Sequence, residues 1–116
     1  MAKIRIRVTI KNSETEDSYE VNAIIQDNII KYREADDTKV SFDYNKNKLI
    51  RENNQMKMLY YFDNKEESSI LVKEYDRSIK LLINTISIKK EKNNLEVNYK
   101  IDEEEFLYRI EEIVWV

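Results

Sequence analysis

The chain contains no cysteine, histidine, glycine or proline among its 116 residues. Without cysteine and histidine the protein has no disulfide, no Cys/His zinc site and no thiolate nucleophile. It also lacks the imidazole group that most enzymes use as a general base. We therefore expect a protein that is not an enzyme and that uses neither a metal nor a cofactor.

The charge and hydropathy of the chain favour neither a nucleic acid nor a membrane as its partner. Twenty Lys and Arg residues against 23 Asp and Glu residues give a net charge of −3, which repels a polyanion over most of the surface. Charged residues occupy every second position from Lys3 to Arg7, so this segment is neither a signal peptide nor a membrane span. We expect a cytoplasmic protein.

Hydrophobic residues alternate with polar ones along most of the chain. From Lys3 to Lys11, isoleucine or valine occupies every second position, which is typical of a β-strand with one buried face. The same alternation recurs in the segments 19–25, 30–32, 40–44, 56–62, 70–72, 79–83 and 95–101. This pattern predicts a single domain over residues 1–116, an all-β antiparallel barrel of about 8–10 short strands.

Asparagine and aspartate have to form the turns, because the chain offers no glycine for backbone with positive φ. These two residue types tolerate the left-handed region best after glycine. Their pairs fall between the alternating runs, at Asp27-Asn28, Asp36-Asp37, Asn45 to Asn47, Asn53-Asn54, Asp63-Asn64 and Asn93-Asn94. The pattern predicts turns at these places and no calcium loops.

Two segments leave the strand pattern. Residues 103–114 fit a short terminal helix with a capping box, or a strand with a β-bulge at Glu111-Glu112; we favour the strand. Near Leu81 to Ile83, an outward Leu82 and the shifted phase of Ile86 and Ile88 also indicate a bulge.

The order and spacing of several segments resemble the YwiB-like family of small bacterial proteins, which have no assigned activity. The resemblance is carried by residues 42–51, 56–62, 75–85, 95–99 and 105–115. It implies a calycin-type β-barrel, closed or nearly closed, that is related in shape to lipocalins and fatty-acid-binding proteins. The resemblance brings no catalytic residues.

Six of the eight tyrosines share the parity of the aliphatic residues, so they are expected on the inner face of the barrel. A barrel of this size either is filled by its side chains or holds one small ligand. The inner tyrosines therefore either fill the interior, with their hydroxyl groups at its two mouths, or line a site for a small amphipathic ligand. They are Tyr19, Tyr32, Tyr44, Tyr60, Tyr99 and Tyr108.

A second set of hydrophobic residues is expected on the outside. Adjacent apolar residues on neighbouring strands form a patch of a kind that usually marks an interaction surface, and we expect it to support a homodimer. The set is Leu59, Tyr61, Leu71, Tyr75 and Leu82. Alternatively, the aliphatic stems of Lys57, Lys73 and Lys80 cover it.

Charged clusters are mostly expected to be solvated surface. The acidic ones lie at turns and strand ends, and a hydrolase that uses two of their carboxylates is the less favoured interpretation. They are Asp36-Asp37, Glu66-Glu67, Glu103 to Glu105 and Glu111-Glu112.

A basic stripe of Lys3, Arg5, Arg7 and Lys11 follows one face of the first strand. We interpret it as protection of an edge strand, with contact to an anionic partner as the alternative. Taken together, the sequence favours a binding or interaction module without enzymatic activity, with lumenal binding of a small amphipathic ligand as the alternative.

Overall fold

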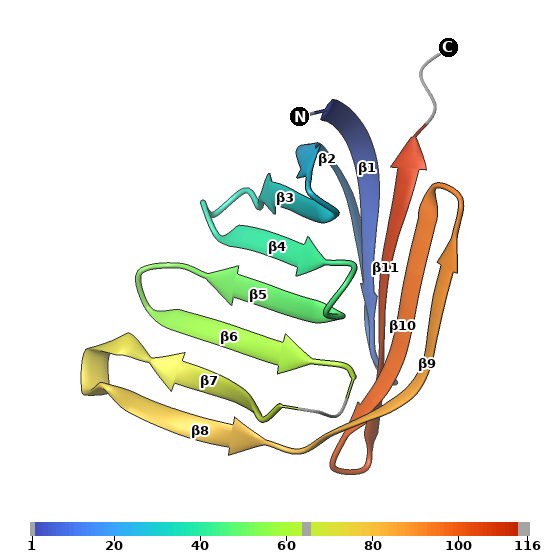
Figure 1. Ribbon diagram of the computed structural model, residues 1–116. Helices are drawn as coiled ribbons and strands as arrows, with labels where there is room; N and C mark the ends of the chain where they lie inside the picture. The colour runs from blue at the N-terminus through green and yellow to red at the C-terminus, as the bar shows by residue number, and fades with distance from the viewer. Residues whose placement is uncertain (1, 64–65, 114–116) are drawn as a thin grey trace.

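A computed structural model describes residues 2–63 and 66–113 and shows an all-β protein (Figure 1). Eleven strands form one antiparallel sheet in the order β8-β7-β6-β5-β4-β3-β2-β1-β11-β10-β9, which is nearly closed into a barrel. The strands are β1 (Ala2–Lys11), β2 (Glu16–Gln26), β3 (Ile29–Arg33), β4 (Lys39–Asp43), β5 (Lys48–Glu52), β6 (Met56–Tyr61), β7 (Ser68–Val72), β8 (Arg77–Leu81), β9 (Ile83–Glu91), β10 (Asn94–Ile101) and β11 (Glu104–Ile113), and a 3₁₀ turn, η1 (Lys73–Tyr75), joins β7 to β8.

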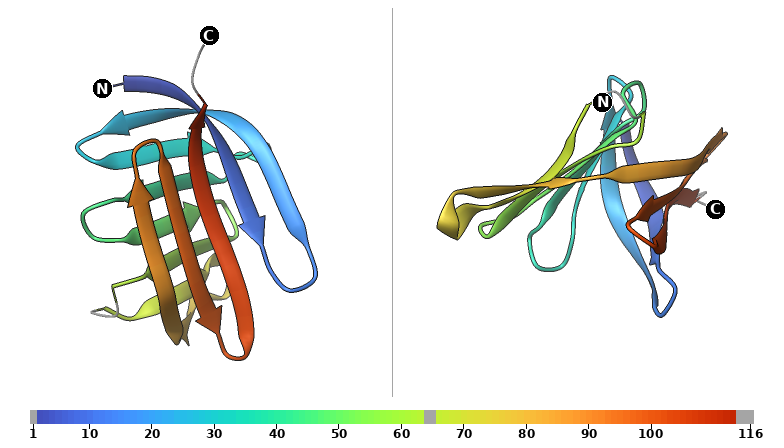
Figure 2. Two further views of the ribbon diagram at one scale, coloured as in Figure 1. Left: turned by 90° about the vertical axis from the view of Figure 1, so that its right-hand side faces the viewer. Right: turned by 90° about the horizontal axis from the view of Figure 1, so that it is seen from below.

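The sheet folds over so that its two parts cross at a steep angle. The long strands β1, β9, β10 and β11 lie in front of the short strands β3 to β8 in the left view of Figure 2. Strand β2 connects the two parts, because it pairs with β1 along most of its length but with β3 only through its last residues, Ala23 to Gln26. The hydrophobic core lies between the two layers.

The period of two explains which side chains enter that core. In β1, Ile6 and Val8 are fully buried while Arg7 between them is exposed. The same pattern holds across the sheet, where the buried residues of β3, β4 and β10 also alternate with exposed or half-buried ones. The predicted all-β barrel is therefore confirmed, although with eleven strands rather than about 8–10.

Strand β5 is a strand that the alternation did not reveal. It is five residues long and has a single buried residue, Leu49. The next residue on the same face is Arg51, whose charge interrupts the hydrophobic alternation. Pairing on both sides, with β4 and β6, holds this segment in the sheet.

Asparagine and aspartate do take the place of glycine in the turns. Both Asp27 and Asn28 have positive φ in the two-residue turn between β2 and β3, as the sequence predicts. Asn53 works differently, because its side-chain oxygen accepts the backbone N–H groups of Gln55 and Met56. Every described residue with positive φ is of these two types: Asp27, Asn28, Asp37, Asn47, Asp76, Asn93 and Asp102. The predicted turn at Asp63-Asn64 extends to Asn64, which lies outside the described residues.

The C-terminal segment is a strand, as favoured, but it contains no bulge at Glu111-Glu112. Strand β11 keeps one register with β1 from Lys11↔Leu107 to Arg5↔Ile113. The alternation breaks there because Glu112 occupies an inward position opposite Ile6 and is only partly buried. Val114 of the predicted segment lies outside the described residues.

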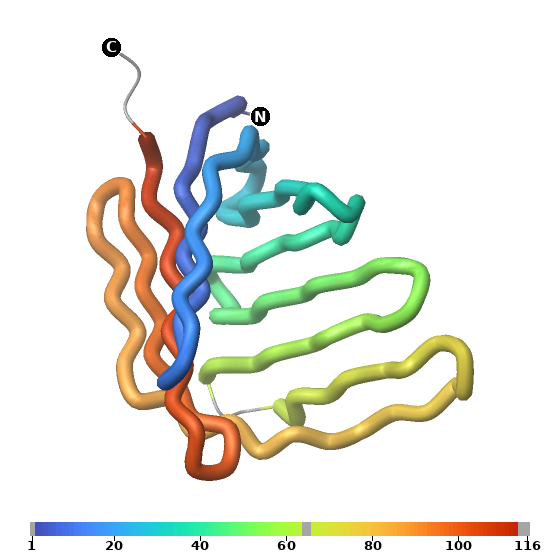
Figure 3. The backbone as a smooth tube through the Cα atoms, turned by 180° about the vertical axis from the view of Figure 1, so that it is seen from behind, coloured from blue at the N-terminus to red at the C-terminus, as the bar shows by residue number. Residues whose placement is uncertain are grey.

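The chain passes from one end of the sheet to the other at Leu82. The sequence predicts one strand over residues 79–83, whereas β8 ends at Leu81 and β9 begins at Ile83. Figure 3 shows the chain, coloured yellow to orange here, continuing from one part of the sheet to the other. These two strands are the free edges of the sheet. A bulge is present, but at Ile86 rather than near Leu81 to Ile83, because Asn98 pairs with Ser87 and Tyr99 with Thr85.

Candidate functional site: an aromatic interior and an outer basic groove

All six inner tyrosines lie at the core. Four are at least 90% buried, with exposures of 5% for Tyr32, 7% for Tyr60, 6% for Tyr99 and 2% for Tyr108. Tyr19 and Tyr44 are half-buried and pack against the core cluster. The sheet therefore brings together residues from β2, β3, β6, β10, β11 and the turn after β4.

Aromatic rings pack against one another inside the barrel. The ring centroid of Tyr99 lies 4.9 Å from that of Phe62, 6.1 Å from that of Tyr60 and 5.4 Å from that of Phe106. Phe42 makes further ring contacts with Phe62 and Tyr108. Such contacts at 4.5–7 Å are those of a packed aromatic cluster, so these rings occupy the interior of the barrel themselves.

Three of the inner tyrosine hydroxyl groups, those of Tyr19, Tyr32 and Tyr108, form hydrogen bonds within the protein. The hydroxyl oxygens of Tyr32 and Tyr108 lie 2.6 Å apart in the core. The Tyr19 hydroxyl donates to Glu34 Oε2 at 2.5 Å, and Arg51 Nη2 donates to Glu34 Oε1. These bonds satisfy polar groups that would otherwise destabilise the core.

Glu34 and Arg51 form the ionic part of this interior network, and sequence reasoning missed both. Glu34 lies in the turn between β3 and β4, which is held by Glu34 N–H donating to the Thr38 carbonyl and Asp37 N–H donating to the Glu34 carbonyl. Arg51 shares the inward parity of Leu49 in β5. The inward position of Arg51 could have been predicted from this parity, but only if β5 had first been recognised as a strand.

Burial keeps the phenol groups in their neutral form. Desolvation, with a contribution from Glu112, raises the pKa of Tyr44 to about 12. Burial also raises the pKa values of Tyr32, Tyr99 and Tyr108. The inner tyrosines therefore stay protonated further into alkaline pH than exposed tyrosines do.

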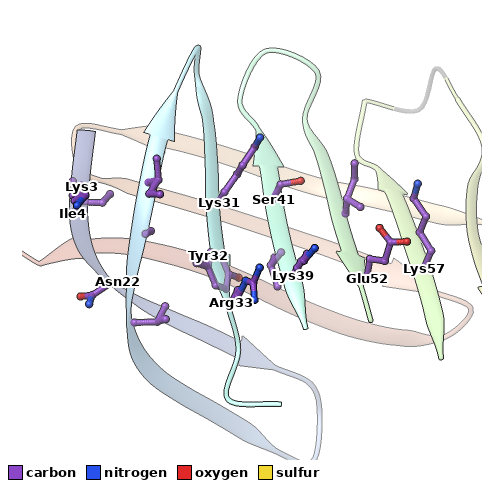
Figure 4. Close-up of a pocket in the computed structure, with 15 residues that line it drawn as sticks. Lys3, Ile4, Asn22, Lys31, Tyr32, Arg33, Lys39, Ser41, Glu52 and Lys57 are labelled. Atoms are coloured by element: carbon purple, nitrogen blue, oxygen red, sulfur yellow. The ribbon is translucent and has the colours of Figure 1, made fainter. Parts of the chain in front are cut away.

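The other face of the sheet carries a groove of about 1130 Å³. It extends over β1 to β6 and is lined mostly by residues of outward parity (Figure 4). Of the six inner tyrosines, only Tyr32 is among the described residues that line it. The groove therefore shares Tyr32 with the aromatic interior but none of the other inner tyrosines.

Two rows of cross-strand neighbours form its surface. The first row runs through Lys3, Ile24, Lys31, Ser41 and Ile50 on β1 to β5. The second runs through Arg33, Lys39, Glu52 and Lys57 on β3 to β6. Residues that are distant in the sequence thus become neighbours at the strand spacing of about 4.8 Å.

The groove is strongly basic although the protein as a whole is acidic. Five of its lining residues are Lys or Arg and one is an acid, Glu52. Glu52 is bound by Lys73 Nζ at 2.9 Å, and this hydrogen bond, with Lys57 and Lys39 nearby, lowers the pKa of the Glu52 carboxyl group. Among the described residues no ion pair involves any of the five cations, which are Lys3, Lys31, Arg33, Lys39 and Lys57.

The basic stripe on β1 does not protect a sheet edge, contrary to the expectation. Strand β1 pairs with β2 on one side and with β11 on the other, so it has no free edge. Arg5 instead donates to the Asn22 side chain at 3.0 Å, and Arg7 pairs with Glu20 at 3.0 Å. Lys3 is the residue of the stripe that lines the groove.

The residues predicted for an interface lie near β6 to β9, but not as one group. Leu59 and Leu71 are diagonal neighbours on β6 and β7. Tyr61 and Leu82 line a second groove of about 560 Å³. Tyr75 lies in η1, near the start of β8, whereas Leu82 follows the end of that strand.

Exposure also differs among these five residues. Leu82 is 75% exposed and Tyr75 is 72% exposed, whereas the other three are half-buried. Lys48, rather than the lysines considered from the sequence, covers Tyr61, with its Nζ 5.2 Å from the ring centroid. Lys73 and Lys80 reach Glu52 and Glu67 instead.

The acidic clusters are spread over the surface. Among the described residues no group of three His, Cys, Asp or Glu side chains is placed to hold a metal ion. Within residues 2–63 and 66–113, no helix has the length and hydropathy needed to span a membrane.

Comparison with known proteins gives a fold but no activity. No family model matches the chain, and no curated protein matches it. The fold is similar to the crystal structure of the YwiB protein from Bacillus subtilis, with a TM-score of 0.53 and 11% identity over 97% of this chain and 91% of that chain. At this identity the likeness shows a shared fold alone. The resemblance to YwiB is thus confirmed for the fold, whereas family membership and the calycin assignment stay predictions.

Proposed function

We propose that the protein is a binding module without enzymatic activity, and that it binds an anionic partner in the outer groove. The observation that carries this proposal is the charge of the groove, where five cations face one carboxylate that is already bound by Lys73. Exposed like charges held this close repel one another, and an anionic partner relieves that repulsion.

The interior supports this choice over binding inside the barrel. Its aromatic rings contact one another at 4.9–6.4 Å, and its Glu34 and Arg51 side chains bind each other. A ligand in the interior would have to displace these contacts. Lumenal binding of a small amphipathic ligand is therefore the less favoured alternative.

Cation-exchange chromatography tests the proposal. A protein with a net charge of −3 should pass through a sulfonate resin near neutral pH unless one face concentrates positive charge. We expect the wild type to be retained at low salt and the double variant Lys31→Glu/Lys39→Glu to flow through.

The matched control is Lys89→Glu/Lys92→Glu, which changes the net charge equally at exposed positions outside the groove. This variant should be retained like the wild type. If the wild type flows through at low salt, or if both double variants lose retention equally, the groove is not a functional anion-binding surface.

A further inference from the structure

We infer that the partner in the outer groove is an acidic peptide segment in an extended conformation that also carries apolar side chains. This inference rests on the proposed function and specifies the class of anion. It is carried by the apolar residues that lie beside the cations in the first row of the groove.

Apolar side chains form part of the groove between the cations. In the first row Ile24 stands between Lys3 and Lys31, and it is 37% exposed. Ile50 ends the row and is half-buried. A partner that carries charge alone would leave these apolar atoms in contact with water, whereas apolar side chains of a peptide would bury them.

The dimensions fit a short extended peptide. The groove covers five strand-to-strand steps from β1 to β6, which at about 4.8 Å each give about 24 Å. An extended chain rises about 3.4 Å per residue, so about seven residues span the groove. At Lys31 and Arg33, two positions apart on β3, the two rows are about 6.8 Å apart, so one extended chain that runs across the strands lies within reach of both rows.

A single-stranded nucleic acid fits less well. Proteins that bind such strands combine cations with exposed aromatic rings on which the bases stack. Tyr32 is the aromatic residue among the described residues that line the groove, and it is 5% exposed. The net negative charge of the rest of the protein also opposes a long polyanion that extends beyond the groove.

A second copy of this chain is a weaker candidate. Its exposed acidic segment from Glu103 to Glu105, at the start of β11, could enter the groove. That contact would be head-to-tail and would build open chains rather than a closed dimer, unless its rotation happened to close a ring. A peptide segment from another protein is free of this constraint.

Fluorescence anisotropy with labelled peptides of about eight residues, long enough to span the groove, tests the inference. The main probe alternates glutamate with leucine. Two control peptides replace every glutamate by glutamine, or every leucine by serine. We expect the glutamate–leucine peptide to bind most tightly, and its affinity to fall as salt increases from about 0.05 to about 0.3 M.

Two variants assign the binding to the two kinds of groove residue. Lys31→Glu/Lys39→Glu should weaken binding of the main probe at least about tenfold, whereas Lys89→Glu/Lys92→Glu should change it less than about twofold. Ile24→Ser should weaken binding of the glutamate–leucine peptide but leave that of the glutamate–serine peptide unchanged. Circular dichroism of each variant confirms that the sheet is intact.

The outcomes separate this inference from the proposed function. If an oligothymidylate of similar length binds through the same lysines and the peptides do not, the inference is wrong and the proposed function stands. Salt-dependent self-association that Lys31→Glu/Lys39→Glu abolishes, with no peptide binding, would identify a second copy as the partner. If no anion binds and the protein flows through the sulfonate resin, both proposals fail.

Discussion

Tyr32 on β3 and Tyr108 on β11 place their hydroxyl oxygens 2.6 Å apart in the core, although 76 positions separate them in the sequence. The bond connects the layer of short strands to the layer of long ones. It is a contact between the two parts of the sheet that depends on a polar group rather than on packing.

Removing both of these hydroxyl groups should cost less stability than the sum of removing each one alone. Tyr108→Phe leaves the Tyr32 hydroxyl without this partner, so the free energy of unfolding should fall by about 1–3 kcal/mol. Tyr32→Phe/Tyr108→Phe removes the pair, and its loss should be smaller than the sum of the two single losses. Urea denaturation of the three variants measures this coupling; strict additivity would show that the bond contributes nothing.

Stability should be constant near neutral pH and should fall in alkali. No side chain of this histidine-free chain has an unperturbed pKa between about 5 and 8, so the melting temperature should be flat there. The inner tyrosines have raised pKa values in the folded state, about 12 for Tyr44. The stability that these raised pKa values contribute is fully present below the unfolded-state tyrosine pKa of about 10. It is lost as the pH rises through the folded-state pKa values.

Thermal unfolding between about pH 5 and about pH 11 measures both parts, because this range covers the neutral plateau and the unfolded-state tyrosine pKa of about 10. Tyr44→Phe removes one of the shifted groups, so it should reduce the loss of stability in alkali while leaving the neutral plateau unchanged. A steep change between about pH 6 and 8 would instead reveal a strongly shifted buried carboxyl group.

The interior should bind a small molecule only after a ring is removed. Tyr99→Ala deletes a ring that contacts Tyr60, Phe62 and Phe106, so we expect a loss of about 3–5 kcal/mol in the free energy of unfolding. The cavity that remains should bind benzene-sized probes, which the wild type should not bind. If the wild type binds fatty acids, and Tyr60→Phe or Tyr99→Phe weakens that binding by about 0.5–1.5 kcal/mol, the lumenal alternative is correct.

The predicted homodimer can be tested at an exposed residue. Leu82 is 75% exposed, so Leu82→Lys should leave the free energy of unfolding unchanged within about 0.5 kcal/mol. If the patch forms a dimer, this change should shift sedimentation toward the monomer, whereas Ser41→Lys, outside that set, should not. A wild type that sediments as a monomer at high concentration would exclude the homodimer.

A turn substitution tests the role of asparagine in a chain without glycine. Asn93 has a φ of 67° between β9 and β10. Asn93→Ala should lower the free energy of unfolding by about 1–2 kcal/mol, because alanine tolerates the left-handed region poorly. Asn93→Gly and the neighbouring control Lys92→Ala should both stay within about 0.5 kcal/mol of the wild type.

The local pattern predicted the faces of the strands but not their neighbours. Alternation placed the six tyrosines on the inner face because parity is a local property of a strand. It did not predict that Arg51 faces inward, because a charged residue at an inward position interrupts the hydrophobic alternation like the end of a strand. It also treated residues 79–83 as one strand, because alternation continues through the bend at Leu82.

The groove could not be found from the sequence for a different reason. Its cations come from β1, β3, β4 and β6, and they become neighbours only through strand order and register. The sequence showed only one local basic stripe, on β1, and we interpreted it wrongly as protection of an edge strand. The groove is therefore a product of the tertiary structure.

The pairing of Arg5 with Ile113 has a consequence for how the protein assembles. The seam between β1 and β11 closes a loop of about a hundred residues, and such distant pairings raise the contact order and slow folding. During synthesis, one side of β1 has no strand to pair with until β11 leaves the ribosome. Until then Ile6 and Val8, which are fully buried in the finished barrel, lie on a strand with an open edge, and the incomplete chain is in this interval most vulnerable to aggregation.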